Sequence, residues 1–313
     1  MKTIAQFSPY DYVDKLMDVR VPGYEGYPGG QVSISQYLSA NSMFGGNSKA
    51  AVLNAAFNRI VHAHNETAVT SQTGFARVFT GQGSRSNFAA AMSIINRYSD
   101  EFRAVRDLAK YFQAQDFLQA MVDDHCFGLD CIGFVGTYLV EASLEDNYVG
   151  RRPLDYTAVF KPVKSLDEVT DCSVVMLTNG MHVQIIDTVN ERGNGYITVD
   201  LCQSTSGGPQ CNLGVTIRSG GGDYLPVETF RQALASRQYS EQHAADNAQR
   251  QNEGKPPRDY ETYLRALLTK HNTAFGFAGG AIFTITGTGE PRNPVSGSVY
   301  IGVAPGGVSV RVP

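Results

Sequence analysis

The sequence lacks a long apolar run, a block of basic residues and a Cys-x-x-Cys pair. No stretch reaches the ~18 apolar residues of a transmembrane helix, so we expect no membrane insertion. Charged residues make up only 18% of the chain and the formal net charge is −4. Without a basic patch, nucleic acid is not an expected partner. The 313 residues, 42% of them hydrophobic, suffice for one large domain or for a core with one or two additions.

The first residues also lack the apolar core of a signal peptide. The opening stretch, MKTIAQFSPYDYVDKL, has one early lysine but no apolar segment of the necessary length. We therefore expect the protein to be made in the cytoplasm without a conventional export signal. If it acts outside the cell, a non-conventional or specialised secretion route is expected.

Cysteine is scarce, and the odd number of five leaves at least one free thiol. His125 lies beside Cys126 and near Cys131, but the spacing is not that of a zinc site, so we predict no metal and no cofactor. Cys202 and Cys211 flank the segment QSTSGGPQ. They are either a small disulfide loop or two buried thiols, because disulfides persist only in oxidising compartments.

The chain divides into three predicted regions. Residues 1–110 are a mainly helical and loop-rich extension, 111–225 form a core, and 226–313 are helical and then β-rich. Helical spacing marks residues 49–65 and a segment that begins at Cys131. Because the strands come in runs and do not alternate with helices, the fold class is α+β.

Three strands are predicted in the second half of the core region. The segments CSVVMLT, HVQIIDTV and YITVDLCQS alternate or carry β-branched residues. The segment ERGNG between the last two has the glycines of a hairpin turn. These segments predict an antiparallel sheet close to the helix that begins at Cys131.

Cys131 stands where a thiol could act as a nucleophile. It opens the helical segment CIGFVGTYLVEAS, and Asp130 before it is a suitable N-cap. The positive end of a helix favours the thiolate, which is the reactive form of cysteine. The backbone N–H of Cys131 could also donate to the oxyanion of a tetrahedral intermediate.

A base for this thiol is expected from the predicted sheet. His182 opens the strand HVQIIDTV, 51 residues after Cys131. A third polar group normally holds the far ring nitrogen of such a histidine and selects its tautomer. The next strand supplies Asp200, Gln203 and Ser204 as candidates. Alternation places Asp200 and Gln203 on opposite faces, and both remain open at this point.

Two segments carry a resemblance to a known family. GLDCIGFV resembles the Gly-Phe-Asp-Cys-Ser-Gly-hydrophobic-Val signature of the NlpC/P60 cysteine hydrolases, which are related to the CHAP amidases. LDEVTDCSVVMLTNGMHVQIIDTV is similar to the second conserved segment of that family, with Ile132 and Thr170 as departures. The resemblance implies a papain-like core in which a nucleophile helix packs on an antiparallel sheet. It also implies that Cys131 and His182 are the catalytic pair.

The function that follows is a cysteine-dependent amide hydrolase. By resemblance, its substrate is a peptide amide bond in peptidoglycan, cleaved through a thioester on Cys131, with Asp200 or Gln203 as the third residue. An immunity or delivery protein is a further expected partner. Two alternatives stay open: an acyltransferase or deamidase on the same core, and a non-enzymatic binding protein in which Cys131 is an ordinary buried thiol. His125 is either a solvated loop residue or an oxyanion donor, and Cys126 a core or a redox thiol.

Overall fold

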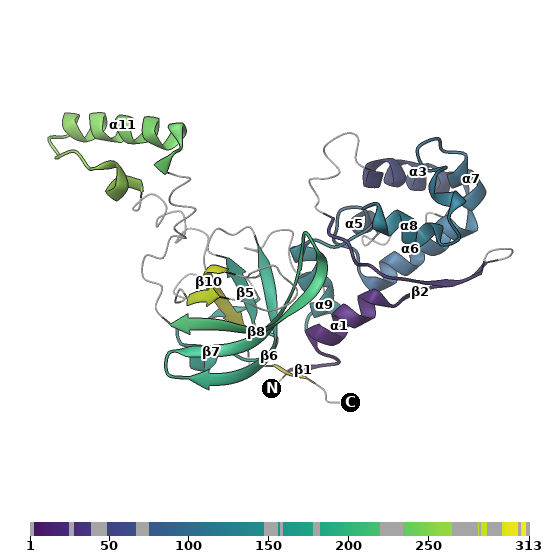
Figure 1. Cartoon of the computed structure of the whole chain (residues 1–313), viewed down its shortest axis with the longest axis horizontal. Helices are drawn as coiled ribbons and strands as arrows, with labels where there is room; N and C mark the ends of the chain where they lie inside the picture. Colours follow the sequence, from purple (N-terminus) through teal and green to yellow (C-terminus); the bar gives the residue numbers. More distant parts are fainter. Residues whose placement is uncertain are drawn as a thin grey trace.

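The structure is a computed structural model. It describes residues 3–24, 28–38, 49–66, 75–146, 156, 159–177, 182–219, 234–264, 281, 283–286, 296–305 and 308–310. A β-barrel and a group of helices lie side by side, with two further helices between them (Figure 1). Within the described ranges, no helix combines the length and apolar character needed to cross a membrane.

Six antiparallel strands form the barrel. They are β5 (Val174–Leu177), β6 (Val183–Gly193), β7 (Tyr196–Thr205), β8 (Gly208–Ser219), β9 (Phe283–Thr286) and β10 (Ser296–Val303). Each strand pairs with the next, and β10 pairs with both β9 and β5, so the sheet closes on itself. A short strand, β4 (Lys161–Pro162), extends the pairing along β10. An apolar cluster that includes Ile186, Leu201 and Ile285 fills the interior.

The predicted papain-like fold, with a helix packed on an open antiparallel sheet, was therefore wrong. The sheet has no open edge, because β9 and β10 return from the C-terminal region and pair with β8 and β5. Closure removes the unpaired backbone groups that the edges of an open sheet would expose. The strands of the barrel thus come from both sides of residue 225, where the predicted core region ends.

The helices lie outside this barrel, most of them in the group beside it (Figure 1). They are α1 (Pro9–Met17), α3 (Lys49–Ala63), α5 (Phe75–Val78), α6 (Arg85–Arg97), α7 (Ser99–Arg103), α8 (Phe117–Asp123) and α9 (Cys131–Glu141), with 3-10 turns η1 (Tyr111–Gln113) and η3 (Leu166–Glu168). Helix α9 packs against β6 and β7, and α1 against β6, β7 and β8 (Figure 1). A second apolar cluster joins these helices to the outer face of the barrel.

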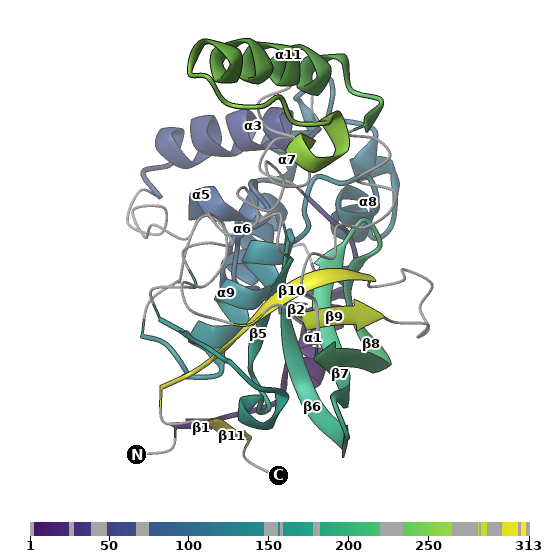
Figure 2. The same ribbon diagram turned by 90° about the vertical axis from the view of Figure 1, so that its left-hand side faces the viewer.

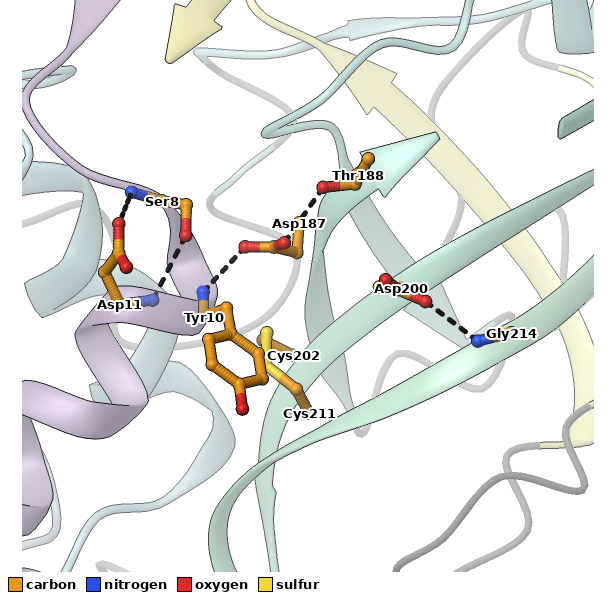
Figure 3. Close-up of a disulfide and its surroundings, with 9 residues drawn as sticks. All are labelled: Ser8, Tyr10, Asp11, Asp187, Thr188, Asp200, Cys202, Cys211 and Gly214. Carbon is orange, nitrogen blue, oxygen red and sulfur yellow. Dashed lines mark hydrogen bonds between the residues drawn. A yellow bond between two sulfur atoms is a disulfide. The ribbon is translucent and has the colours of Figure 1, made fainter. Parts of the chain in front are cut away.

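Local sequence signals explain where α1 begins. Ser8 caps it and exchanges hydrogen bonds with Asp11 in a capping box, while Pro9 occupies its first turn. The N–H of Tyr10 donates to Asp187 of β6 at 2.7 Å, as Figure 3 shows. A carboxylate at the positive end of a helix is favourable, so this contact helps to hold α1 on the barrel.

The first and last of the described strands pair below the barrel. Strand β1 (Thr3–Ala5) runs parallel to β11 (Val308–Val310), as Figures 1 and 2 show. A two-stranded ribbon of β2 (Val19–Val21) and β3 (Gly30–Val32) runs along the helical group. Helix α11 (Arg237–Asn252) has no buried residue and lies apart from the barrel in Figure 1.

Strands β5, β6 and β7 confirm the strands predicted at 172–178, 182–189 and 196–204, with β6 continuing to Gly193, but β8 was missed. Its glycines and proline are typical of a loop; Gly208 and Gly214 have φ angles of +82° and +68°. β8 pairs with β7 over its whole length, and Cys202 lies directly opposite Cys211. These two cysteines form a disulfide (Figure 3), which decides between the two possibilities that the sequence left open.

We predict that this disulfide contributes to stability. Replacing both Cys202 and Cys211 by Ala should lower the free energy of unfolding by about 2–3 kcal/mol, because the bond closes a short loop in the unfolded chain. Urea titrations followed by circular dichroism measure the change. Dithiothreitol should destabilise the wild-type protein and leave the double variant unaffected. A wild-type protein shown by mass spectrometry to be reduced, yet equally stable, would contradict the prediction.

Candidate active site

The site is built on the N-terminal end of α9. Asp130 is the N-cap, as predicted, and its carboxylate accepts the N–H of Gly133 at 2.5 Å. The helix is apolar nearly all round, and its residues from Gly133 to Leu139 are all buried. Such a helix has to be covered on every side, which explains its position between the barrel and the other helices.

Two contacts hold the start of α9 in place. On one side, the turn at residues 81–83 lies against it: the N–H of Asp130 donates to the Gly81 carbonyl at 2.8 Å. A Cβ on Gly133 would overlap that same carbonyl oxygen, so the close approach requires glycine. On the other side, the hydroxyl of Ser204 on β7 donates to the Leu129 carbonyl at 2.6 Å. The segment that carries Cys131 is thereby held between the helical group and the barrel.

Cys131 meets the barrel next to His182. Its side chain is nearly buried, with 5% of the residue exposed. Burial raises the pKa of the Cys131 thiol to about 11; the N–H of Val183 lowers that pKa by hydrogen bonding, and the charge of Asp130 raises it. Val183 follows His182 directly, so the Cys131 sulfur lies against the residue that comes after the predicted base. The resting site thus favours a neutral thiol.

His182 is held by Gln203. The Nε2 atom of His182 lies 2.7 Å from Oε1 of Gln203, which is buried on β7. Because a carboxamide oxygen only accepts, this contact places the imidazole proton on Nε2 and leaves Nδ1 as the acceptor. Burial lowers the pKa of His182, and the hydrogen bond that His182 donates to Gln203 opposes this effect. The histidine is therefore neutral near pH 7, as a general base has to be.

Gln184 completes this cluster, and the sequence analysis did not single it out. Its Nε2 donates to the same Oε1 of Gln203 at 2.8 Å. The available signal was strand periodicity: Gln184 follows His182 by two residues, so the two share a face of the strand. Gln82 was also missed. It lies in the turn against α9, and its side chain bonds to Asp130.

Asp200 is not brought to His182. Its carboxylate accepts the Gly214 N–H and the Asn190 side chain, each at 2.8 Å (Figure 3 shows the first). It therefore ties β7 to β8 near an irregularity in their pairing. Ser204, the other candidate on this strand, binds the Leu129 carbonyl instead. Of the predicted third residues, Gln203 is the one in contact with the histidine.

The other two candidates near the start of α9 are occupied elsewhere. His125 is exposed, and its Nδ1 lies 3.4 Å from the Tyr37 carbonyl. The Cys126 sulfur lies 3.4 Å from the Tyr111 hydroxyl, and burial raises the pKa of this thiol to about 11. These contacts are those of a loop residue and a core thiol.

Asp130 adds a titratable charge beside the thiol. Burial raises the pKa of Asp130 to about 7, against the hydrogen bonds from Gly133, Gln82 and Ile132, which lower it. The carboxyl is thus partly protonated at neutral pH. Because its negative charge disfavours the thiolate, the reactivity of Cys131 depends on the charge of this neighbour.

Comparisons with known proteins found no matching family model, no matching curated protein and no matching solved structure. In the part of the chain that the structure describes, no group of three or more His, Cys, Asp or Glu side chains could hold a metal ion. The geometry around Cys131 and the resemblance of its flanking residues are therefore the observations that bear on function.

The close packing of α9 predicts whether Gly133→Ala stabilises or destabilises the protein. On helix propensity alone, Gly133→Ala should stabilise the protein by up to about 1 kcal/mol. The overlap with Gly81 predicts the opposite, a destabilisation of about 1–3 kcal/mol. Thermal and urea unfolding measure the change in the free energy of unfolding. Gly30→Ala is the control, because a Cβ at Gly30 has nothing within 4 Å. A Gly133→Ala variant as stable as wild type would refute the packing argument.

The raised pKa of Cys131 predicts slow alkylation. A thiol of pKa about 11 carries about a hundredfold less thiolate at pH 7.5 than a free cysteine does, and the thiolate is the form that reacts. The iodoacetamide rate at Cys131, followed by peptide mass spectrometry, should therefore be low at pH 7.5. It should rise about tenfold per pH unit until the pH reaches the pKa.

A matched variant tests the role of Asp130 in this reaction. Asp130→Asn keeps an N-cap oxygen but removes the charge, so the pKa of Cys131 should fall and alkylation at pH 8.5 should be faster than in wild type. Equal rates would show that the charge does not act on the thiol. A wild-type rate above that of free cysteine would show a preformed thiolate.

Proposed function

We propose that the protein is a cysteine-dependent amide hydrolase in which Cys131 is the nucleophile, His182 the base and Gln203 the residue that orients the base. The observation that carries the proposal is the hydrogen bond from His182 to Gln203, next to the N–H of Val183 that faces the Cys131 sulfur. A thiol, an imidazole and an orienting amide in this order are the parts of a nucleophile activated by a neighbouring base.

The mechanism starts from a neutral pair. Nδ1 of His182 takes the thiol proton as the Cys131 sulfur attacks the amide carbonyl carbon. The negative oxygen of the tetrahedral intermediate is stabilised at the positive end of α9, where the Cys131 N–H lies. The imidazolium then protonates the leaving amine as the C–N bond breaks. Water attacks the resulting thioester with His182 again as base, which releases the carboxylate and restores the thiol.

The substrate class comes from the resemblance of two segments to the NlpC/P60 hydrolases, and we propose a peptide amide bond in peptidoglycan. The Cys202–Cys211 disulfide supports a place of action outside the reducing cytoplasm, since such bonds persist in oxidising compartments. Delivery by a specialised secretion route agrees with this location. An immunity or delivery protein as partner stays a prediction.

One observation favours a second candidate, a binding protein that does not use its thiol. Cys131 is nearly buried, and burial raises its pKa well above that of a free thiol. Core cysteines commonly have these properties. The hydrolase remains the better proposal because a core thiol gives no reason for a part-buried hydrogen bond between His182 and Gln203, which has to overcome the desolvation of polar groups.

The test is digestion of purified peptidoglycan. Wild-type protein should release soluble muropeptides, and Cys131→Ala should reduce the rate by about 10³-fold or more, because the nucleophile is lost. Liquid chromatography with mass spectrometry identifies the products and the bond cleaved. Equal release by both proteins would remove the hydrolase proposal.

Two further variants separate the candidate third residues. Gln203→Ala should reduce kcat by about tenfold to a hundredfold, because His182 loses its orientation. Asp200→Asn should leave kcat within about twofold, since Asp200 makes its contacts with Asn190 and Gly214. Cys126→Ser controls for the loss of a buried thiol away from His182. The reverse ranking of Gln203 and Asp200 would contradict the assignment.

A further inference from the structure

Two buried glutamines lie behind His182 on neighbouring strands. Gln184 of β6 is 3% exposed and Gln203 of β7 is 1% exposed. Ile185 and Cys202 are paired in the antiparallel sheet, and Gln184 precedes the first while Gln203 follows the second, so the sheet register brings their side chains together. A single atom, Oε1 of Gln203, accepts both from His182 at 2.7 Å and from Gln184 at 2.8 Å.

We propose that Gln184 is a positioning residue that selects the tautomer of His182 by holding the carboxamide of Gln203 in one orientation. This inference rests on the proposed function, in which Nδ1 of His182 receives the proton of Cys131. It concerns a residue that acts on the histidine through Gln203, to which its side chain donates.

The argument starts from the shape of a carboxamide. Its oxygen and its NH₂ group have nearly the same size, so packing alone hardly distinguishes the two orientations of Gln203. Rotated by half a turn, Gln203 would present NH₂ to His182. The imidazole would then accept at Nε2 and carry its proton on Nδ1, where no proton can be received from the thiol. One flip of a side chain would therefore disable the base.

Gln184 opposes this flip. In the observed orientation its NH₂ donates to the Gln203 oxygen, whereas after a flip two NH₂ groups would face each other. The orientation of the Gln184 carboxamide also supports its role in holding Gln203. Oε1 of Gln184 is buried and has no hydrogen-bond partner among the described residues, an unfavourable arrangement for an acceptor. Turning Gln184 over alone would instead bring two acceptor oxygens together, so neither carboxamide can turn without the other.

The backbone keeps Gln184 in reach. It lies opposite Val175 in the pairing of β5 with β6, and the Cys202–Cys211 disulfide joins the strand of Gln203 to β8 one residue away. Ile186 lies two residues from Gln184 on β6, and Leu201 lies two residues from Gln203 on β7. Both therefore share the face of their glutamine, and both belong to the apolar cluster in the barrel interior. The two carboxamides thus lie on one side of the barrel wall, between His182 and the apolar interior.

The test is the tautomer of His182, measured by ¹⁵N NMR of histidine-labelled protein above the pKa of His182, with the His182→Gln variant used to assign its signals among the six histidines. In wild type, Nε2 should carry the proton. Gln184→Met should populate the Nδ1–H form and lower kcat on peptidoglycan about tenfold with little change in KM. An unchanged Nε2–H tautomer in folded Gln184→Met would overturn the proposal.

The Gln203→Glu background is the matched control. A carboxylate has two acceptor oxygens and no orientation to select, so Gln184→Met should not change the tautomer there. A purely structural role would lower stability equally in both backgrounds without moving the tautomer. If Gln184→Met does not fold, Gln184→Glu serves instead. Its carboxylate should draw the Gln203 NH₂ toward itself and give the Nδ1–H form, and an Nε2–H form there would equally overturn the proposal.

The outcomes separate this inference from the proposed function. Activity retained by Cys131→Ala would remove the hydrolase, and the tautomer signals would still report whether Gln184 orients Gln203. An unaffected tautomer, together with a catalytically essential Cys131, would remove the role of Gln184 and leave the hydrolase in place.

Discussion

The close approach of α9 to the turn at residues 81–83 is the contact on which the candidate site depends. Gly133 has no side chain at the point where the Gly81 carbonyl reaches the helix, and that carbonyl also accepts the N–H of Asp130. The Ser204 hydroxyl holds the preceding residues from the barrel side. With the start of the helix held from both directions, the Cys131 sulfur is fixed against the first residue of β6.

The electrostatics of this place follow from burial. Cys131 is buried and His182 is partly buried, which raises the pKa of the thiol and lowers that of the imidazole. Both groups are then neutral at pH 7, and charge separation is left to the reaction itself. In such a site, the tautomer of the histidine matters as much as its distance from the sulfur. The hydrogen bonds from His182 and Gln184 to Gln203 bear directly on that tautomer.

Closure of the barrel explains how the remainder of the chain supports the site. β6 and β7, which carry Gln184 and Gln203, lie in the middle of the strand order, with His182 directly before β6, and β9 and β10 close the ring from the C-terminal region. A closed sheet cannot slip in register without breaking pairs all round. The disulfide between β7 and β8 adds a covalent link next to Gln203. The distant strands therefore help to keep the positions of the site residues constant.

The sequence by itself determined the local elements: the start of α9 at Cys131 with its Asp130 cap, and the strands that carry His182 and Gln203. Capping and alternation are properties of neighbouring residues, so they can be recognised without the fold. Only the tertiary structure decided that the sheet closes into a barrel, that β8 exists in spite of its glycines, and that Cys202 and Cys211 are joined. It also decided that Gln203 and not Asp200 meets the histidine. These features depend on pairing between distant segments and on which strand face meets which partner, and neither is encoded in local periodicity.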